Sequence, residues 1–157
     1  MDELLKIEAI KRLKYKYFRC LDSKLWEEMG EVLTDNATAA YDSGKYAYEG
    51  KPAIIEFLSS SLGDREVISK HMGHHPEITL TGSDRAEGIW YFEDYVIFQA
   101  AAMRLRGAGF YHDRYVQIDG EWKIEHTGYA RTFEEMQTEK DGAKWSLTHY
   151  GDHLEKD

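Results

Sequence analysis

An acidic residue in an apolar row is the first candidate for chemistry in this sequence. Asp94 interrupts a run of apolar residues at every second position, namely Trp90, Phe92, Val96 and Phe98. Alternate residues of a strand share one face, so Asp94 is expected among apolar side chains. A carboxylate removed from water needs a partner, which makes Asp94 a candidate functional group. The alternatives are that this face is exposed or that Asp94 only anchors an arginine.

Histidines concentrate in the segment 70–76, which contains His71, His74 and His75. Histidine is the side chain best suited to transfer protons near neutral pH. A zinc site would need three or four ligands at compatible spacing, and neither a helical HExxH nor a paired CxxC motif occurs. We therefore expect no metal, and the alternative to catalysis is a surface or structural role.

Tyr17, Asp22 and Arg131 could support a proton-transferring group. Tyr17 and Asp22 flank the end of an expected helix, where the alternatives are a core tyrosine and a helix cap. Arg131 shares strand parity with Tyr129 and Phe133, which places it either against aromatic walls or on the surface. Nucleophile motifs such as GxSxG and phosphate-binding glycine loops are absent, so acid–base chemistry is what remains.

Three helices are expected to position these groups. Apolar residues recur every three or four positions over 2–21 and again over 24–33, with Asp22 or Ser23 as the second N-cap. A third helix is expected over 51–62, because Pro52 suits a first helical turn.

Alternating β-branched and aromatic residues predict strands over 37–41, 46–49, 77–80, 85–99, 109–118 and 122–133. Asp119-Gly120 predicts a tight hairpin turn, and further turns are expected at 42–45, 82–84 and 104–107. Helices followed by antiparallel strands favour an α+β fold in which the helices cover one face of a curled sheet. A small-molecule pocket is expected between the two layers.

Size and charge limit the partners. The 157 residues fit one domain, and the tail 136–157 lacks periodicity. A formal net charge of −9 disfavours nucleic acid and anionic membranes. The lone Cys20, the charged N-terminus and the lack of a long apolar segment favour a cytoplasmic protein. The 13% aromatic content suits an apolar cavity or an ordinary core.

Five strings resemble bile acid 7α-dehydratase: IEAIKRLKYKYFRCLD, HMGHHPEIT, WYFEDYVIF, GFYHDRY and IDGEWKIEHTGYAR. They occur in the same order over residues 7–135. The resemblance implies a SnoaL-like domain, 1–135, of the nuclear transport factor 2-like (NTF2-like) superfamily, which includes scytalone dehydratase and ketosteroid isomerase. It implies a cone-shaped antiparallel sheet against three N-terminal helices, and a homo-oligomer, either dimer or trimer.

The resemblance also implies the site. It places catalytic residues at Tyr17, Asp22, His71, Asp94 and Arg131. Substrate-binding residues fall at Tyr41 and His74. The segment 99–108 and the tail differ from the dehydratases, so the substrate can differ while the chemistry is shared.

The implied reaction eliminates water from a hydroxylated 3-oxo-4-ene steroid or bile acid derivative, including a coenzyme A ester. His71 would be the general base and Asp94 would orient its imidazolium. Tyr17, tuned by Asp22, would donate to the developing oxyanion or to the leaving oxygen, and Arg131 would hold a charged group or balance the acids. No cofactor is needed for this reaction. Alternatives are an enzyme similar to ketosteroid isomerase or a polyketide cyclase, and a non-catalytic ligand-binding module.

Overall fold

The computed structural model describes residues 2–138. Within this range the helices are α1 (Asp2–Ser23), α2 (Trp26–Val32) and α3 (Lys51–Leu62). The strands are β1 (Leu33–Tyr41), β2 (Tyr46–Glu49), β3 (Val67–Leu80), β4 (Arg85–Phe98), β5 (Met103–Ile118) and β6 (Glu121–Thr138). They form one six-stranded sheet in the order β2-β1-β6-β5-β4-β3.

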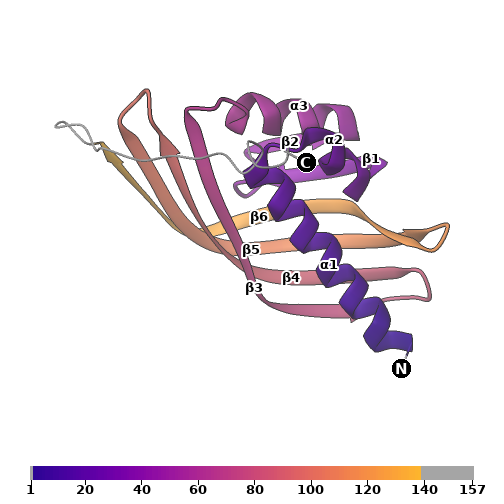
Figure 1. Ribbon diagram of the computed structural model, residues 1–157. Helices are drawn as coiled ribbons and strands as arrows, with labels where there is room; N and C mark the ends of the chain where they lie inside the picture. Colours follow the sequence, from indigo (N-terminus) through magenta and orange to yellow (C-terminus); the bar gives the residue numbers. More distant parts are fainter. Residues whose placement is uncertain (1, 139–157) are drawn as a thin grey trace, which may run out of the picture.

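The sheet is curved, and the helices lie on one of its faces (Figure 1). α1 crosses the strands diagonally, while α2 and α3 lie beside the β1–β2 hairpin. The expectation of an antiparallel sheet is wrong at one pairing, because β1 runs parallel to β6. These two strands are far apart in the sequence, so no hairpin turn sets their relative direction. The sheet is therefore mixed.

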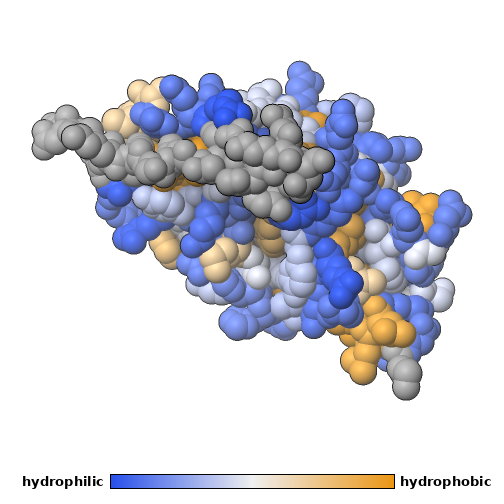
Figure 2. Space-filling view, viewed as in Figure 1, coloured by the Kyte–Doolittle hydropathy of each residue, from blue (hydrophilic) through white to orange (hydrophobic). Residues whose placement is uncertain are grey.

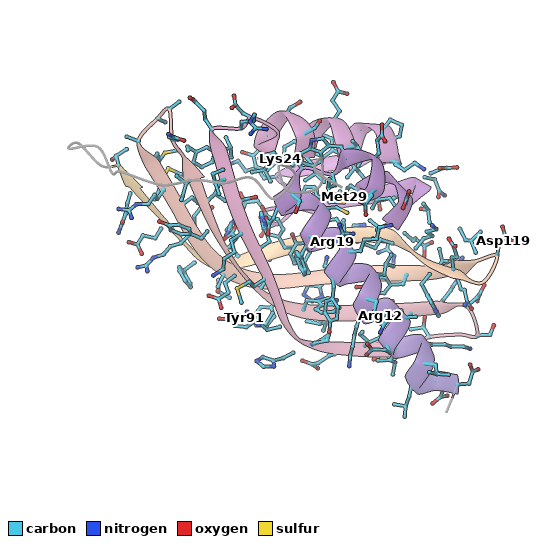
Figure 3. The ribbon with its side chains drawn as sticks, in the orientation of Figure 1. Arg12, Arg19, Lys24, Met29, Tyr91 and Asp119 are labelled. Atoms are coloured by element: carbon cyan, nitrogen blue, oxygen red, sulfur yellow. The ribbon has the colours of Figure 1, made fainter. Side chains whose placement is uncertain are left out.

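One face of α1 is buried against the sheet. Ile10, Tyr17, Phe18 and Leu21 are buried as the periodicity predicts, and Lys14 is buried with them. Arg12 and Arg19 lie on the outer side of this helix (Figure 3). None of the helices within residues 2–138 is long and apolar enough to cross a membrane.

The surface seen from the α1 side is mostly hydrophilic (Figure 2). Apolar side chains gather near the start of α1, where Leu4 and Leu5 are exposed. The opposite end of α1 carries Tyr17 and Leu21, which are buried. The buried core extends along the sheet-facing side of α1 from Ile10 to Leu21.

Two strands, β3 and β5, begin six or more residues before the sequence predicts. β3 begins at Val67, ten residues before the expected start, so the histidine segment belongs to a strand. A register shift between His74 and Glu77, with His75 at a φ of 45°, marks a bulge there. β5 begins at Met103, so the turn expected at 104–107 is wrong and lies instead at 99–102. The bulge shifts the alternation of β3 by one residue. Odd-numbered residues such as His71 therefore point inward before it, and even-numbered residues such as Ile78 point inward after it.

The predicted turns at 42–45 and at Asp119-Gly120 are confirmed. Asp119 and Gly120 have positive φ angles of 52° and 86°, the conformation of a tight hairpin turn. Figure 3 shows Asp119 at the tip of the β5–β6 hairpin. The division at residue 135 stays a prediction: β6 continues to Thr138, and 139–157 lie outside the described residues.

Candidate active site

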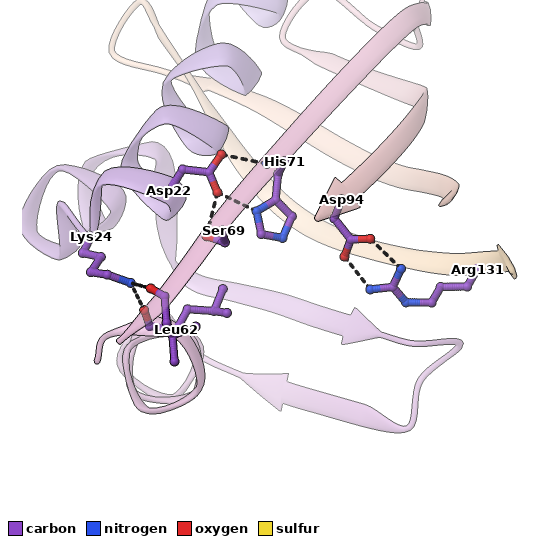
Figure 4. Close-up of polar contacts among 8 residues, drawn as sticks. Asp22, Lys24, Leu62, Ser69, His71, Asp94 and Arg131 are labelled. Carbon is purple, nitrogen blue, oxygen red and sulfur yellow. Dashed lines mark hydrogen bonds and ion pairs between the residues drawn. The ribbon is translucent and has the colours of Figure 1, made fainter. Parts of the chain in front are cut away.

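A histidine and an aspartate form a hydrogen-bonded pair where α1 ends above β3 (Figure 4). His71 Nδ1 lies 2.7 Å from Asp22 Oδ1, and the backbone N–H of His71 donates to Asp22 Oδ2 at 2.7 Å. Ser69 Oγ donates to Asp22 Oδ1 at 2.8 Å. Three donors from one strand thus fix a carboxylate from the last turn of α1.

The Asp22 contact determines which histidine nitrogen is free to accept a proton. A carboxylate accepts hydrogen bonds, so Nδ1 of His71 carries the hydrogen and donates it to Asp22. The lone pair of the neutral imidazole is then on Nε2. The His71 side chain is 9% exposed and lines a cavity. This is the arrangement of an oriented general base.

A second ion pair lies beside the histidine on the same face of the sheet. Asp94 accepts from Arg131 Nη1 at 2.9 Å and from Nη2 at 2.5 Å, a bidentate pair. Arg131 Nε lies 3.1 Å from Glu134 Oε2. Its guanidinium also lies over the rings of Phe92 and Tyr129, with Cζ 5.6 and 5.3 Å from the ring centres. Arg131 thus lies against aromatic rings as one alternative predicted, but beside Tyr129 the second ring is Phe92 of β4, whereas Phe133 is exposed.

Burial opposes the charge on Arg131, yet its partners outweigh that effect. Desolvation lowers the pKa of Arg131, whereas the hydrogen bonds and charge of Asp94 raise it above the usual value. Tyr129 and Glu134 add smaller effects in the same direction. Arg131 is therefore a permanent cation whose charge is directed at two carboxylates.

Gly107 leaves space for this ion pair. It lies opposite Asp94 in the β4–β5 register. A Cβ at position 107 would collide with Nη1 of Arg131 and would lie 2.8 Å from the carbonyl oxygen of Phe133 and 3.3 Å from Asp94 Oδ1. Any side chain here would push the guanidinium off Asp94. The absence of a side chain at Gly107 therefore allows Arg131 to reach Asp94.

Two tyrosines supply hydroxyl groups on the helix side of the cavity. The hydroxyl oxygens of Tyr17 and Tyr41 lie 3.0 Å apart. Burial raises the pKa of both phenols well above the usual value, so both are protonated donors. Tyr111 and Tyr129 also line the cavity, and burial raises the pKa of each. The polar groups of the cavity are thus neutral donors together with one histidine and one ion pair.

These groups surround a half-enclosed cavity of about 160 Å³ between sheet and helices. It is lined by Tyr17, Leu21, Tyr41, Phe57, Leu58, Ser61, Leu62, His71, Asp94, Val96, Phe98, Leu105, Tyr111, Tyr129 and Arg131. An apolar cavity with a few convergent polar groups is typical of a small-molecule site. Among residues 2–138 no group of three or more histidine, cysteine or acidic side chains could hold a metal ion.

The sequence matches the SnoaL-like domain family over residues 2–128. The chain belongs to this family. Its fold resembles that of a hexachlorocyclohexane dehydrochlorinase (LinA) Type2, with a TM-score of 0.79, 17% identity and coverage of 93% of this chain and 96% of the other. A hexachlorocyclohexane dehydrochlorinase LinA-type3 from Novosphingobium barchaimii also has a similar fold. Its TM-score is 0.79 at 17% identity, with 94% of this chain and 98% of the other covered.

A protein named "Putative Scytalone Dehydratase", from Novosphingobium aromaticivorans, has the same fold. Its TM-score is 0.76 at 18% identity, with 90% of this SnoaL-like chain and 97% of the other covered. These similarities confirm the predicted NTF2-like cone of helices and curved sheet. The names of these neighbours denote lyases, which catalyse elimination reactions.

In this SnoaL-like protein the five residues expected to be catalytic come together at one end of the fold. Four line the cavity, and Asp22 contacts it through His71. The predicted His71–Asp94 contact is wrong, because Asp22 holds the imidazole, whereas Asp94 pairs with Arg131, which was the alternative for this acid. Tyr17 is bonded to Tyr41 rather than tuned by Asp22. His71 gains its carboxylate from a helix because Arg131 binds the one on the neighbouring strand.

Three further expectations concern the positions of Tyr41, His74 and the cap of α2. Tyr41 lines the cavity as expected. His74, in contrast, is the β3 residue just before the bulge and does not line the cavity. Its Nε2 lies 3.2 Å from Glu93 Oε1. Neither Asp22 nor Ser23 caps α2, because α1 runs through both and the N-cap of α2 is Leu25 without a side-chain hydrogen bond.

Sequence reasoning missed Ser69 and Tyr111. Ser69 holds Asp22, and its position two residues before His71 would have placed both on one face had a strand been expected there. Tyr111 follows the alternation of Tyr111, Asp113 and Tyr115 in β5, all buried. Alternation alone indicates that Tyr111 faces inward, but it cannot distinguish a core ring from a cavity wall.

Proposed function

We propose that this SnoaL-like protein is a cofactor-independent hydro-lyase that eliminates water from a hydroxylated cyclic ketone. The 3-oxo-4-ene steroids and bile acid derivatives, including coenzyme A esters, are the substrate class that its sequence motifs favour. The proposal is carried by the Asp22–His71 pair, which leaves Nε2 free at the wall of an apolar cavity. Neighbours of the same fold are named for elimination reactions, which supports a lyase.

His71 Nε2 removes a proton from a carbon made acidic by the conjugated ketone. The electrons of the broken C–H bond move into a dienolate, which then expels the neighbouring hydroxyl group. The protonated His71 returns the proton to that hydroxyl, so the products are a more unsaturated ketone and water. Asp22 stabilises the imidazolium that exists between the two proton transfers, through its 2.7 Å contact with Nδ1.

The hydrogen-bonded pair of Tyr17 and Tyr41 donates to the oxygen on which negative charge develops. Both phenols are buried and protonated, and one hydroxyl donates to the other, which leaves one O–H in place to donate when the dienolate forms. Asp94 and Arg131 form the wall next to the imidazole and define its position relative to the substrate. The cavity of about 160 Å³ encloses the reacting ring, and the rest of a fused-ring substrate extends through the mouth.

Replacing His71 by alanine tests the proposal. Loss of a positioned acid–base group typically lowers turnover by about 10²- to 10⁴-fold, and Asp22 is absent from the cavity lining. We expect at least this loss with a panel of hydroxylated 3-oxo-4-ene steroids and their thioesters, measured as loss of one water from the substrate mass. His74→Ala is the matched control and should retain turnover, because His74 is outside the cavity lining.

The product masses distinguish the alternatives. A product of unchanged mass would indicate an isomerase or cyclase with the same general base. Normal water loss by His71→Ala would contradict the mechanism. Tight ligand binding without turnover across the panel would indicate a binding module.

A further inference from the structure

The cations at the cavity are already paired with carboxylates. Among the described residues that line the cavity, His71 and Arg131 are the two that can carry positive charge. Asp22 holds Nδ1 of His71 at 2.7 Å. Asp94 takes both Nη groups of Arg131, and Glu134 lies 3.1 Å from its Nε. A ligand entering the cavity meets cations that are each bound to an acid.

Two lysines close to residues of the site are engaged as well, and the carboxylates whose charge acts on Lys24 are Asp22 and Asp64. Lys24 Nζ donates to two carbonyl oxygens, those of Leu62 at the end of α3 and Val67 at the start of β3. Lys14 Nζ is 2.7 Å from Asp113, and the side chains of both are fully buried. Neither lysine lines the cavity. Each cation that lines the cavity is therefore already paired with a carboxylate, even with a protonated His71.

An anionic group placed in this cavity would lose its hydration without gaining an unpaired cation. Removing a carboxylate from water is costly unless it is ion-paired, and like charges nearby increase that cost. The tyrosine hydroxyls are neutral donors, which suit a carbonyl oxygen. The transient oxyanion differs from a permanent anion, because it forms together with the positive charge on His71.

We infer that the part of the ligand that enters this cavity is uncharged, a neutral cyclic ketone or alcohol. A carboxylate, phosphate or coenzyme A group belongs outside the mouth, in solvent. Arg131 is thus a wall residue neutralised by Asp94 and Glu134, and not the anchor for a substrate anion. The inference concerns the cavity of the proposed function but is tested by binding, which does not require turnover.

A matched pair of probes tests it directly. 2-Acetylnaphthalene and 2-naphthoate share one ring system and differ in charge at neutral pH. Dissociation constants are measured at low ionic strength by calorimetry, and shifts of the His71 ring signals in NMR spectra report occupancy of the cavity. We expect the ketone to bind the wild-type protein at least about tenfold more tightly than the carboxylate.

Variants that remove an acid should change this preference. Asp94→Asn releases the Arg131 guanidinium and should raise the affinity for 2-naphthoate at least about tenfold. Glu134→Gln, at a more exposed position, should raise it about threefold and leave the affinity for the ketone unchanged. Glu135→Gln is the matched control, because Glu135 pairs with Arg106 and is absent from the cavity lining; it should change neither affinity.

Equal or tighter binding of 2-naphthoate by the wild-type protein would overturn the inference. So would an unchanged naphthoate affinity in both Asp94→Asn and Glu134→Gln, or failure of the ketone to shift the His71 signals. If the ketone preference holds but no substrate loses water, the proposed function fails and the inference stands. If water is eliminated but the carboxylate binds as tightly as the ketone, the inference fails and the proposed function stands.

Discussion

Two buried carboxylate–cation pairs lie between the helices and the sheet, and their surroundings differ. Asp94 and Arg131 face the cavity, where the Arg131 side chain keeps 11% exposure. Asp113 and Lys14 are sealed, with both side chains fully buried. The first pair can respond to a ligand. The second has no access to one.

The sealed pair is embedded in aromatic rings. Lys14 Nζ lies 3.7 Å from the ring centre of Tyr111 and 4.4 Å from that of Tyr17. Asp113 accepts from the Tyr115 hydroxyl at 2.8 Å, and that hydroxyl accepts from Trp90 Nε1 at 2.9 Å. Burial lowers the pKa of Lys14, and the charge and hydrogen bond of Asp113 act against that shift. This network supports the back of the rings whose other sides form the cavity.

The comparison predicts that the sealed pair governs stability and the cavity-facing pair governs activity. Lys14→Met leaves Asp113 buried without a cation, so the free energy of unfolding should fall by about 3–5 kcal/mol. Chemical denaturation measures this change. Lys14→Met/Asp113→Asn removes both charges and should recover most of the loss.

Lys16→Met is the matched control for Lys14→Met. Lys16 lies on the same helix but forms an exposed ion pair with Glu31, so its replacement should cost no more than about 1 kcal/mol. If the Lys14 and Lys16 variants lost equal stability, the buried ion pair would contribute no more to the free energy of unfolding than the exposed one. If Lys14→Met kept its stability but lost turnover, the pair would belong to the active site.

Arg131→Lys tests the cavity-facing pair. Lysine keeps the charge but cannot make the bidentate contact with Asp94, so one charge-assisted hydrogen bond of about 1.5–3 kcal/mol is lost. We expect kcat/KM for the steroid panel to fall by about tenfold or more, with a smaller loss of stability than in Lys14→Met.

Arg106→Lys provides the comparison for Arg131→Lys, because Arg106 pairs with Glu135 on the exposed part of β5. It should leave kcat/KM unchanged. A loss of activity in Arg106→Lys equal to that in Arg131→Lys would show that the cavity position carries no special effect.

The two pairs also show what sequence patterns can predict. Alternation in β4 correctly indicates that Asp94 faces inward, because Trp90 and Phe92 on the same face are fully buried. The helix over 51–62 is confirmed at both ends. Such features depend on residues close together in the sequence, so local patterns determine them.

Partner choice depends on tertiary packing and was not predictable in the same way. His71 and Asp94 are opposite each other in the β3–β4 register, which makes a contact between them the natural expectation. Arg131, 37 residues further on, offers two donors to Asp94, and Asp22 approaches His71 from the helix. Lys14 occupies the apolar stripe of α1 for a similar reason, since only Asp113 on β5 compensates its charge.

The two regions also differ in how stability depends on pH in the alkaline range. This effect is smaller than those above, and the cavity tyrosines and Lys14 contribute to it with opposite sign. Burial raises the pKa of the cavity tyrosines Tyr17, Tyr41 and Tyr111 well above the usual value. In the unfolded chain a tyrosine ionises near about pH 10, so the folded state holds more protons above that pH. The stability from these phenols is therefore full below about pH 10 and is lost as the pH rises through their folded-state pKa.

Lys14 has the opposite sign, because its pKa is lowered and the unfolded chain binds more protons just below the usual lysine value. Its contribution to stability therefore rises with pH in that window. We expect wild-type protein to unfold on the alkaline side as the buried tyrosines ionise, with tyrosinate absorbance and far-ultraviolet circular dichroism changing together. Tyr41→Phe should move this transition to higher pH, whereas Tyr46→Phe at an exposed position should not. Ionisation of all tyrosines in one step with the fold intact would contradict the assignment of these phenols to a dry cavity wall.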